Sequence, residues 1–196
     1  MQPLQREKLF ANHELLTLLW PLIIEQTLSV LVGMADTVMV SSVGEAAISG
    51  VSLVDMINQL IITVFAALAT GGTIICAQYI GNKNDRAAHN ASNQVMLSVI
   101  AISLMIMTIG IVLRKPLLRA VFGAVEDDVM SNALTYFTIT VVSYPFIAIH
   151  DASAALFRST GNSKLPMLVT MGVNVLNIVG NAVLIFIFKL GVMGAA

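Results

Sequence analysis

The chain has 196 residues, of which 57% are hydrophobic and 11% are charged. Soluble domains are usually about 45 to 50% apolar, so this composition predicts an integral membrane protein. The formal net charge of −1 provides no basic surface for a phosphate backbone, so we expect no nucleic-acid partner. Cys76 is the single cysteine, which excludes an intrachain disulfide and any paired-cysteine metal or redox site.

Five stretches of the chain are long and apolar enough to cross a lipid bilayer. A helix needs about 20 mainly apolar residues to span a hydrocarbon core of about 30 Å. Short polar joints that contain Gly, Pro or Asn separate the stretches. We therefore predict an all-α, polytopic transmembrane bundle over residues 15–196, after a cytoplasmic segment at residues 1–14. The predicted spans lie near residues 15–40, 50–80, 91–113, 132–157 and 165–188.

The basic residues predict the orientation of this bundle. Lys and Arg in short loops favour the cytoplasmic side of a membrane. The side that holds the N-terminus carries more of them, namely Arg6, Lys8, Lys83, Arg86, Arg158 and Lys164, against Arg114, Lys115, Arg119 and Lys189 on the other side. We therefore expect a multi-pass protein of the cytoplasmic membrane, surrounded by lipid, with a cytoplasmic N-terminus.

A polar stripe runs along the last predicted span. At about 100° per residue, Thr170, Asn174, Asn177 and Asn181 fall within about 60° of one another on the helix surface. Such a face does not point toward lipid. Two interpretations remain open: the side chains hydrogen-bond neighbouring helices together, or they line a polar pocket.

The first predicted span carries two carboxylates, Glu25 and Asp36. They are separated by about three helical turns, so both lie on one face. A carboxylate deep in a span costs roughly 2.5 to 3.5 kcal/mol on insertion scales and usually faces a bundle interior or a wet cavity. By depth, Asp36 and Asn181 both fall in the outer half of the bilayer.

Carboxylate and carboxamide oxygens suit a hard cation such as Na⁺, and a buried carboxyl group can also take up a proton. We therefore predict a cation or proton site, and a candidate Na⁺ site, built by Asp36, Asn177 and Asn181. The alternative for Asp36 is an interfacial residue near the end of its helix.

Further polar residues are candidates for the lining of a cavity. Asp55 and Asn58, near the predicted start of the second span, are placed at its outer mouth, with an ordinary interfacial position as the alternative. The complete set of candidate lining residues is Glu25, Asn174, Thr170, Asp55 and Asn58. No motif for phosphate binding, zinc hydrolysis or a nucleophile is present, so we expect no enzyme, no other metal site and no cofactor besides a coupling H⁺ or Na⁺.

Several segments, in this order, resemble one transporter family. They are "PLIIEQTLSVLVGMADTVMVSSVG", "CAQYIGNKNDRAA", "YPFIAIHDASAALFRSTGNSKLPM", "NVLNIVGNAVLIF" and "LGVMGAA". Together they resemble the multidrug and toxic compound extrusion (MATE) family. The resemblance implies that Asp36 takes the place of the acidic residue in the family's first helix, which is involved in cation or proton coupling. It also implies that Asn177 and Asn181 match the polar pair of the fifth helix.

Two residues depart from the family pattern. Glu25 stands where a small or neutral residue is expected, and Asn174 is a third amide beside the usual pair. The role of Glu25 is open at this point: it tunes Asp36, contacts a cationic drug, or reflects divergence.

The resemblance implies a twelve-helix transporter with two six-helix lobes. We expect this chain to be most of the N-terminal lobe, truncated before the sixth helix, with a second lobe or another copy of the chain as partner. The implied function is a cation-coupled antiporter that exports small organic, often cationic, compounds. The alternatives are a lipid-linked precursor flippase of the same superfamily, which the acidic or neutral interior disfavours, and a membrane scaffold that transports nothing.

Overall fold

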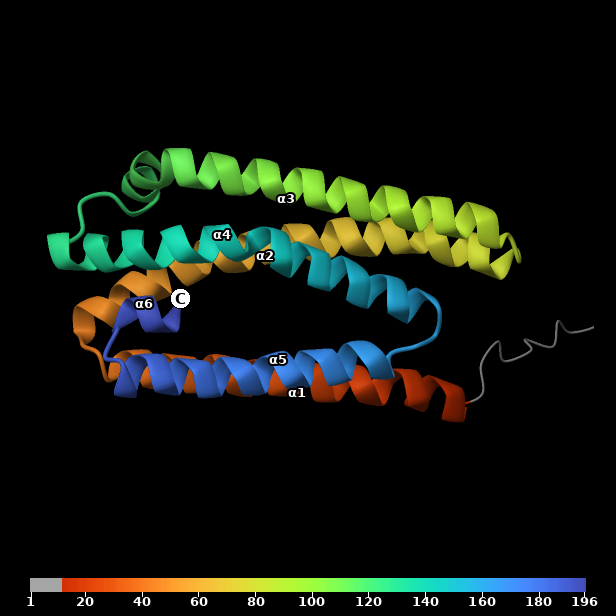
Figure 1. Cartoon of the computed structure of the whole chain (residues 1–196), viewed down its shortest axis with the longest axis horizontal. Helices are drawn as coiled ribbons and strands as arrows, with labels where there is room; N and C mark the ends of the chain where they lie inside the picture. Colours follow the sequence, from red (N-terminus) through yellow and green to blue (C-terminus); the bar gives the residue numbers. More distant parts are fainter. Residues whose placement is uncertain (1–11) are drawn as a thin grey trace, which may run out of the picture.

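The computed structural model describes residues 12–196, and these residues form helices and short connections without any strand. Five of the helices are long (Figure 1). The fifth continues into a π-helical turn, after which the chain turns back into a four-residue helix. The elements are α1 (Asn12–Ser41), α2 (Glu45–Gly81), α3 (Asp85–Phe122), α4 (Asp127–Ser159), α5 (Lys164–Ala182), η1 (Val183–Ile187) and α6 (Val192–Ala195).

All five long helices are long and apolar enough to cross a membrane, which confirms the predicted all-α bundle with five spans. The segments that meet this criterion are Leu19–Ser41, Glu45–Gly81, Asp85–Phe122, Asp127–Ser159 and Lys164–Ile187. The predicted cytoplasmic segment at residues 1–14 falls mostly outside the described residues, as do Arg6 and Lys8. The predicted location of this segment and of these two residues on the cytoplasmic side stays a prediction.

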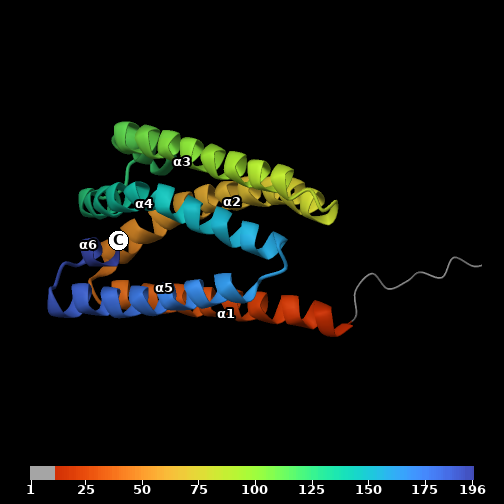
Figure 2. The same ribbon diagram turned by 45° about the vertical axis from the view of Figure 1, so that its right-hand side comes forward.

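The helices form two parts. The first part, which we call the α1–α5 pair, consists of two helices that lie side by side and run in the same direction (Figures 1 and 2). The second part, the three-helix body, consists of α2, α3 and α4, which pack against one another. We call the end at which α1 begins the N-terminal end of the bundle. It also holds the connections at residues 82–84 and 160–163, and the opposite end holds those at residues 42–44 and 123–126.

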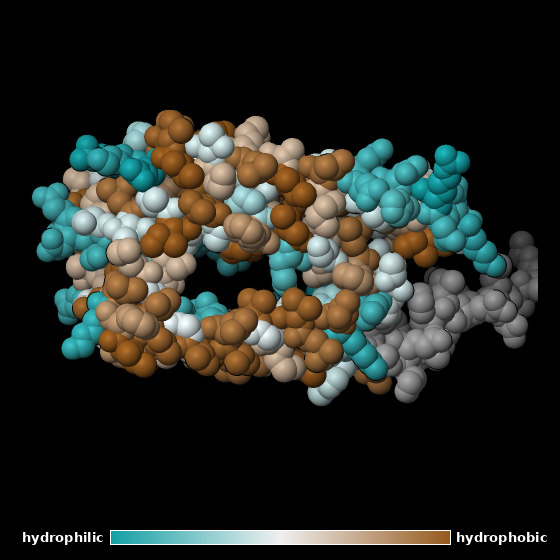
Figure 3. All heavy atoms as spheres, in the orientation of Figure 1, coloured by the Kyte–Doolittle hydropathy of each residue, from teal (hydrophilic) through white to brown (hydrophobic). Residues whose placement is uncertain are grey.

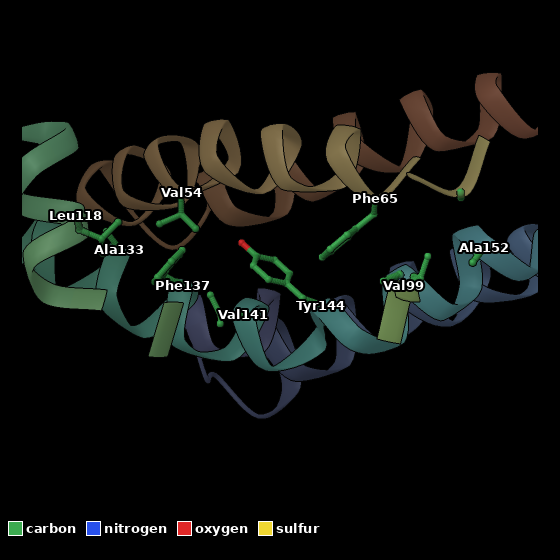
Figure 4. Close-up of a cluster of buried hydrophobic side chains, with 11 residues drawn as sticks. Val54, Phe65, Val99, Leu118, Ala133, Phe137, Val141, Tyr144 and Ala152 are labelled. Atoms are coloured by element: carbon green, nitrogen blue, oxygen red, sulfur yellow. The ribbon is translucent and has the colours of Figure 1, made fainter. Parts of the chain in front are cut away.

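A buried apolar core holds the three-helix body together. Figure 4 shows the Tyr144 ring of α4 pointing toward α2, among side chains that include Val54, Phe65 and Phe137. The rings of Phe65 and Tyr144 meet edge to face, with centroids 6.1 Å apart. The Tyr144 hydroxyl donates a hydrogen bond of 2.8 Å to Asn58 Oδ1. This core therefore uses Asn58 as the polar partner of a buried tyrosine.

Glycines allow α2 to approach its neighbours closely. A methyl group at Gly50 would lie 2.9 Å from both Ala133 N and Val129 O of α4. A methyl group at Gly72 would collide with the Val95 side chain of α3. Small residues at such crossings let the backbones of membrane helices come into contact, which strengthens their dispersion attraction.

The second helix begins earlier than predicted, at Glu45 instead of near residue 50. Asp55 and Asn58 consequently lie about three turns inside α2 rather than at its start. Asn58 is only 9% exposed and bonds to Tyr144, so it lies in the packed interface between α2 and α4. The physical reason is that α4 packs against this face of α2 and covers it.

The third helix is also longer than predicted and extends to Phe122 instead of ending near residue 113. The polar sequence around Pro116 was interpreted as a joint, but the proline lies inside the helix. A proline removes one backbone donor and bends a helix without always ending it. The helix ends at Gly123, whose φ of 67° is a conformation that glycine adopts without strain.

Candidate functional site

Two side-chain hydrogen bonds join α1 to α5 in one register. Thr170 Oγ1 donates to Glu25 Oε1 at 3.3 Å, and Asn181 Nδ2 donates to Asp36 Oδ1 at 2.9 Å. Both bonds connect residues that are 145 positions apart. Because the two helices are parallel, they form two rungs about 16 Å apart along the pair. We call them the Glu25 rung and the Asp36 rung.

The Asp36 rung contains the three residues predicted to build a cation or proton site. Asn181 is 7% exposed, and Asp36 is half-buried. In the amide orientation that suits its surroundings, the nitrogen of Asn177 lies 3.2 Å from each carboxylate oxygen of Asp36. Two carboxamides of α5 therefore donate to one carboxylate of α1, and such charge-assisted bonds are stronger than bonds between neutral groups.

Asp36 also faces a pocket of about 230 Å³ between the α1–α5 pair and the three-helix body. Asp55 of α2 and Tyr136 of α4 line the same pocket, so two carboxylates meet there. The Tyr136 hydroxyl donates to Asp55 Oδ1 at 3.1 Å, and Asn58 Nδ2 donates to the same oxygen at 3.4 Å. Asp55 is therefore held in place from two sides, while Asp36 is held by α5.

The Glu25 rung contains an ion pair that the sequence did not reveal. Arg158 Nη1 of α4 lies 3.3 Å from Glu25 Oε1 and 3.1 Å from Oε2. Arg158 was interpreted as a loop residue, but it stands in the last turn of α4 and reaches into the bundle. The signal that could have found this pair is Glu25 itself, because a carboxylate within a span usually faces the bundle interior and pairs with another polar or charged group.

The remaining candidate residues are placed differently. Thr170 is 8% exposed and bound to Glu25. Asn174 lies on α5 between the two rungs, and its buried Nδ2 has no hydrogen-bond partner among the residues that the structure describes. The structure thus unites Asp36, Asn177 and Asn181, and it brings Asp55 to their pocket. Asn58 bonds to Asp55 but lies in the interface between α2 and α4, and the Nδ2 of Asn174 bonds to none of these residues.

The space between the two parts of the molecule is open in the space-filling view. Figure 3 shows an opening between the α1–α5 pair and the three-helix body, with hydrophilic residues at its edge. The outer surface of the α1–α5 pair in the same view is mostly hydrophobic. Among the side chains that the structure describes, no three of His, Cys, Asp or Glu cluster as a metal-binding group.

Comparison with known proteins gives one family. The MatE family model matches residues 21–183 of the chain. The chain is 34% identical over 187 residues to a protein of Bacillus subtilis named "Uncharacterized transporter YisQ". It is 31% identical over 195 residues to the "Probable multidrug resistance protein NorM" of Thermotoga maritima. Each match covers 94% of this chain, but the chain spans only 40% of the length of either relative.

Solved structures share the arrangement of the helices. A crystal structure of MATE in complex with MaL6 superimposes with a TM-score of 0.88 at 24% identity, covering 93% of this chain and 40% of that one. A MOP superfamily transporter from Pyrococcus furiosus, described as having a binding pocket of reverse polarity, gives a TM-score of 0.87 at 23% identity with the same coverage. At this identity the likeness concerns the fold.

Proposed function

Because this chain belongs to the MatE family of multidrug and toxic compound extrusion transporters, we propose that it acts in an antiporter that exports organic, often cationic, compounds in exchange for H⁺ or Na⁺. In this proposal the chain supplies helices of one lobe, and a second lobe or another copy completes the transporter. The protein lies in the cytoplasmic membrane with its N-terminus in the cytoplasm. It is a transporter and not an enzyme.

The main observation behind the proposal is the hydrogen-bonded carboxylate of Asp36. The amide nitrogens of Asn177 and Asn181 donate to this carboxylate. A carboxamide has a donor on one side and an acceptor on the other, so rotation of the amides would offer oxygens to a bound Na⁺. Protonation of Asp36 would remove the charge that these donors stabilise. Either cation therefore changes how α1 is bonded to α5.

The residues that line the pocket beside Asp36 support the proposal that the exported compound is cationic. Asp36 and Asp55 contribute two carboxylates, and no Lys or Arg is among the residues that line this pocket. A concave site with one sign of charge attracts ligands of the opposite sign. A cationic compound and a coupling cation would compete for the same carboxylates, which is the requirement for exchange. The acidic lining also argues against a flippase for anionic, lipid-linked precursors.

The proposal is tested by Asp36→Asn in the full-length protein. We expect efflux driven by an ion gradient to be lost, because the amide neither takes up a proton nor holds a cation by charge, while membrane insertion persists. The measurement is efflux of a fluorescent cationic compound from cells that express each variant, with expression checked in the membrane fraction.

Asp128→Asn serves as the matched control, because Asp128 is an exposed carboxylate at the start of α4. This variant should retain efflux. Unchanged efflux in Asp36→Asn would remove Asp36 from the mechanism. Collapsing the pH gradient and the Na⁺ gradient separately in the unmodified protein identifies the coupling ion.

A further inference from the structure

The α1–α5 pair is joined to the three-helix body by few polar contacts. Among the described side chains, every side-chain hydrogen bond between the two parts comes from the Arg158 guanidinium to the Glu25 carboxylate. The other bonds to residues of the pair, including those of the Asp36 rung, stay inside the pair. The two parts otherwise meet through packing of α1 on α2 and of α5 on α4, and the short helix α6 also packs on α4.

The Glu25 carboxylate connects three helices. It lies on α1, receives Arg158 from α4 at both oxygens, and receives Thr170 from α5. The side chains of Glu25 and Arg158 are 17% and 31% exposed. A partly buried ion pair is costly to break, because loss of one partner leaves a desolvated charge without its counterion.

Glu25 and Asp36 lie on the same helix, α1, so the ion pair and the Asp36 rung both involve the α1–α5 pair. Asp36 and its two amide donors all lie on α1 and α5, so a tilt of the pair would move them together. Asp55 and Tyr136, on the other side of the pocket, belong to the three-helix body and would not move with them. The position of the pair therefore decides the width of the pocket without changing the hydrogen bonds of Asp36.

We propose that the Glu25–Arg158 ion pair is a latch that fixes the α1–α5 pair against α4 and thereby positions the Asp36 rung opposite Asp55. Glu25 and Arg158 are positioning residues in this scheme. Breaking the latch releases the N-terminal half of α1 from α4 and lets the pocket widen. The bonds between Asp36, Asn177 and Asn181 persist.

The latch is tested by a distance measurement on the full-length protein in lipid nanodiscs, with its native cysteines replaced. Spin labels are attached at Ile23→Cys of α1 and Phe157→Cys of α4, both exposed positions at 53% and 44%. Pulsed electron paramagnetic resonance then gives the distribution of distances between α1 and α4. This measurement needs no transport, so its outcome is independent of the proposed function.

With the latch intact, we expect a narrow distribution of the distances between the two spin labels. Glu25→Gln and Arg158→Gln should each broaden it and add a longer component, and the charge-swapped double variant Glu25→Arg with Arg158→Glu should restore the narrow form. Lys164→Gln is the matched control, because it removes an exposed positive charge at the same end of the bundle, and it should change nothing. Should a neutral variant fail to insert, Arg158→Lys keeps the charge with fewer donors, and we expect an intermediate width.

Two results would overturn the latch. One is a distribution that stays narrow in both Gln variants and in Arg158→Lys. The other is a broad distribution that the charge swap fails to restore, because the two residues would then act separately.

A second readout rests on the proposed function. Loss of the latch should lower the turnover of efflux by about tenfold, the change expected when one charged hydrogen bond is lost, and leave the half-saturating concentration of the coupling cation unchanged. A raised half-saturating concentration with unchanged turnover would place Glu25 at the cation site instead and would contradict the latch.

Discussion

At the scale of single residues, the three asparagines of α5 have different surroundings although they share one face. Asn177 and Asn181 donate to Asp36, whereas the amide nitrogen of Asn174 is buried without a partner among the described residues. Helical periodicity predicts the shared face but not this difference. The register of α1 against α5 decides it, because Asp36 stands opposite Asn181, while Ser29, which stands opposite Asn174, donates to the Glu25 backbone oxygen.

This difference allows a matched comparison on one helix. Asn181→Ala should raise the concentration of the coupling cation needed for half-maximal efflux by about tenfold, because Asp36 loses a charge-assisted donor and a ligand oxygen. Asn174→Ala should change this concentration by less than about twofold, since its amide nitrogen makes no bond that the substitution would remove. The measurement is the initial rate of efflux against cation concentration, in membranes that contain equal amounts of each variant.

A double variant of the same helix tests the scaffold alternative. Replacing Asn177 and Asn181 with alanine together should abolish cation-dependent binding of a cationic compound, while the protein still assembles in the membrane. Loss of assembly with intact cation-dependent binding would instead favour polar residues that only hold helices together, and would contradict the proposed site.

At the scale of the helices, composition and periodicity predicted the five spans because apolar length is a local property of the sequence. They also placed Asp36 and Asn181 at a similar depth, since both helices were expected to start on the same side of the membrane. The Glu25–Arg158 pair could not be predicted in this way. It joins residues 133 positions apart, and it depends on how close the end of α4 comes to α1. The sequence did not predict that Pro116 lies inside α3 or that α2 begins at Glu45, because the bounds of a helix depend on tertiary packing.

Close packing of α2 on α4 gives a prediction for stability. Gly50→Ala should lower the free energy of unfolding by about 1 to 3 kcal/mol, because the added methyl group would meet backbone atoms of α4 that cannot move aside. Gly71→Ala, also in α2, has open space around the added methyl group. It should be neutral or stabilise the helix by up to about 1 kcal/mol.

The comparison is made by thermal unfolding of the purified protein in one detergent, followed by fluorescence-detected size-exclusion chromatography. The midpoint should fall for Gly50→Ala and stay or rise for Gly71→Ala. An equal midpoint for the two variants would mean that the contact between α2 and α4 at Gly50 does not limit the stability of the bundle.

At the scale of the whole molecule, the five spans place alternate connections on opposite sides of a membrane. The connections at residues 82–84 and 160–163 share the N-terminal end of the bundle, and those at residues 42–44 and 123–126 share the other. Basic residues near the first set include Lys83, Arg86 and Lys164, which are exposed. Arg158 stands there too but is held by Glu25. The predicted orientation therefore depends on these three exposed cations together with Arg6 and Lys8, because the opposite end carries Arg114, Lys115, Arg119 and Lys189.

This orientation is tested by single cysteines in an otherwise cysteine-free full-length protein. Asn82→Cys and Thr160→Cys should react with a membrane-impermeant maleimide only after the cells are lysed, because both positions are exposed at the N-terminal end of the bundle. Val43→Cys and Ala124→Cys should react in intact cells, because they lie in exposed connections at the other end. The reverse pattern would place the N-terminus outside, and Asp36 would then lie in the inner half of the bilayer. The coupling cation would then reach Asp36 more readily from the cytoplasm than from outside, which would contradict uptake of the cation during export.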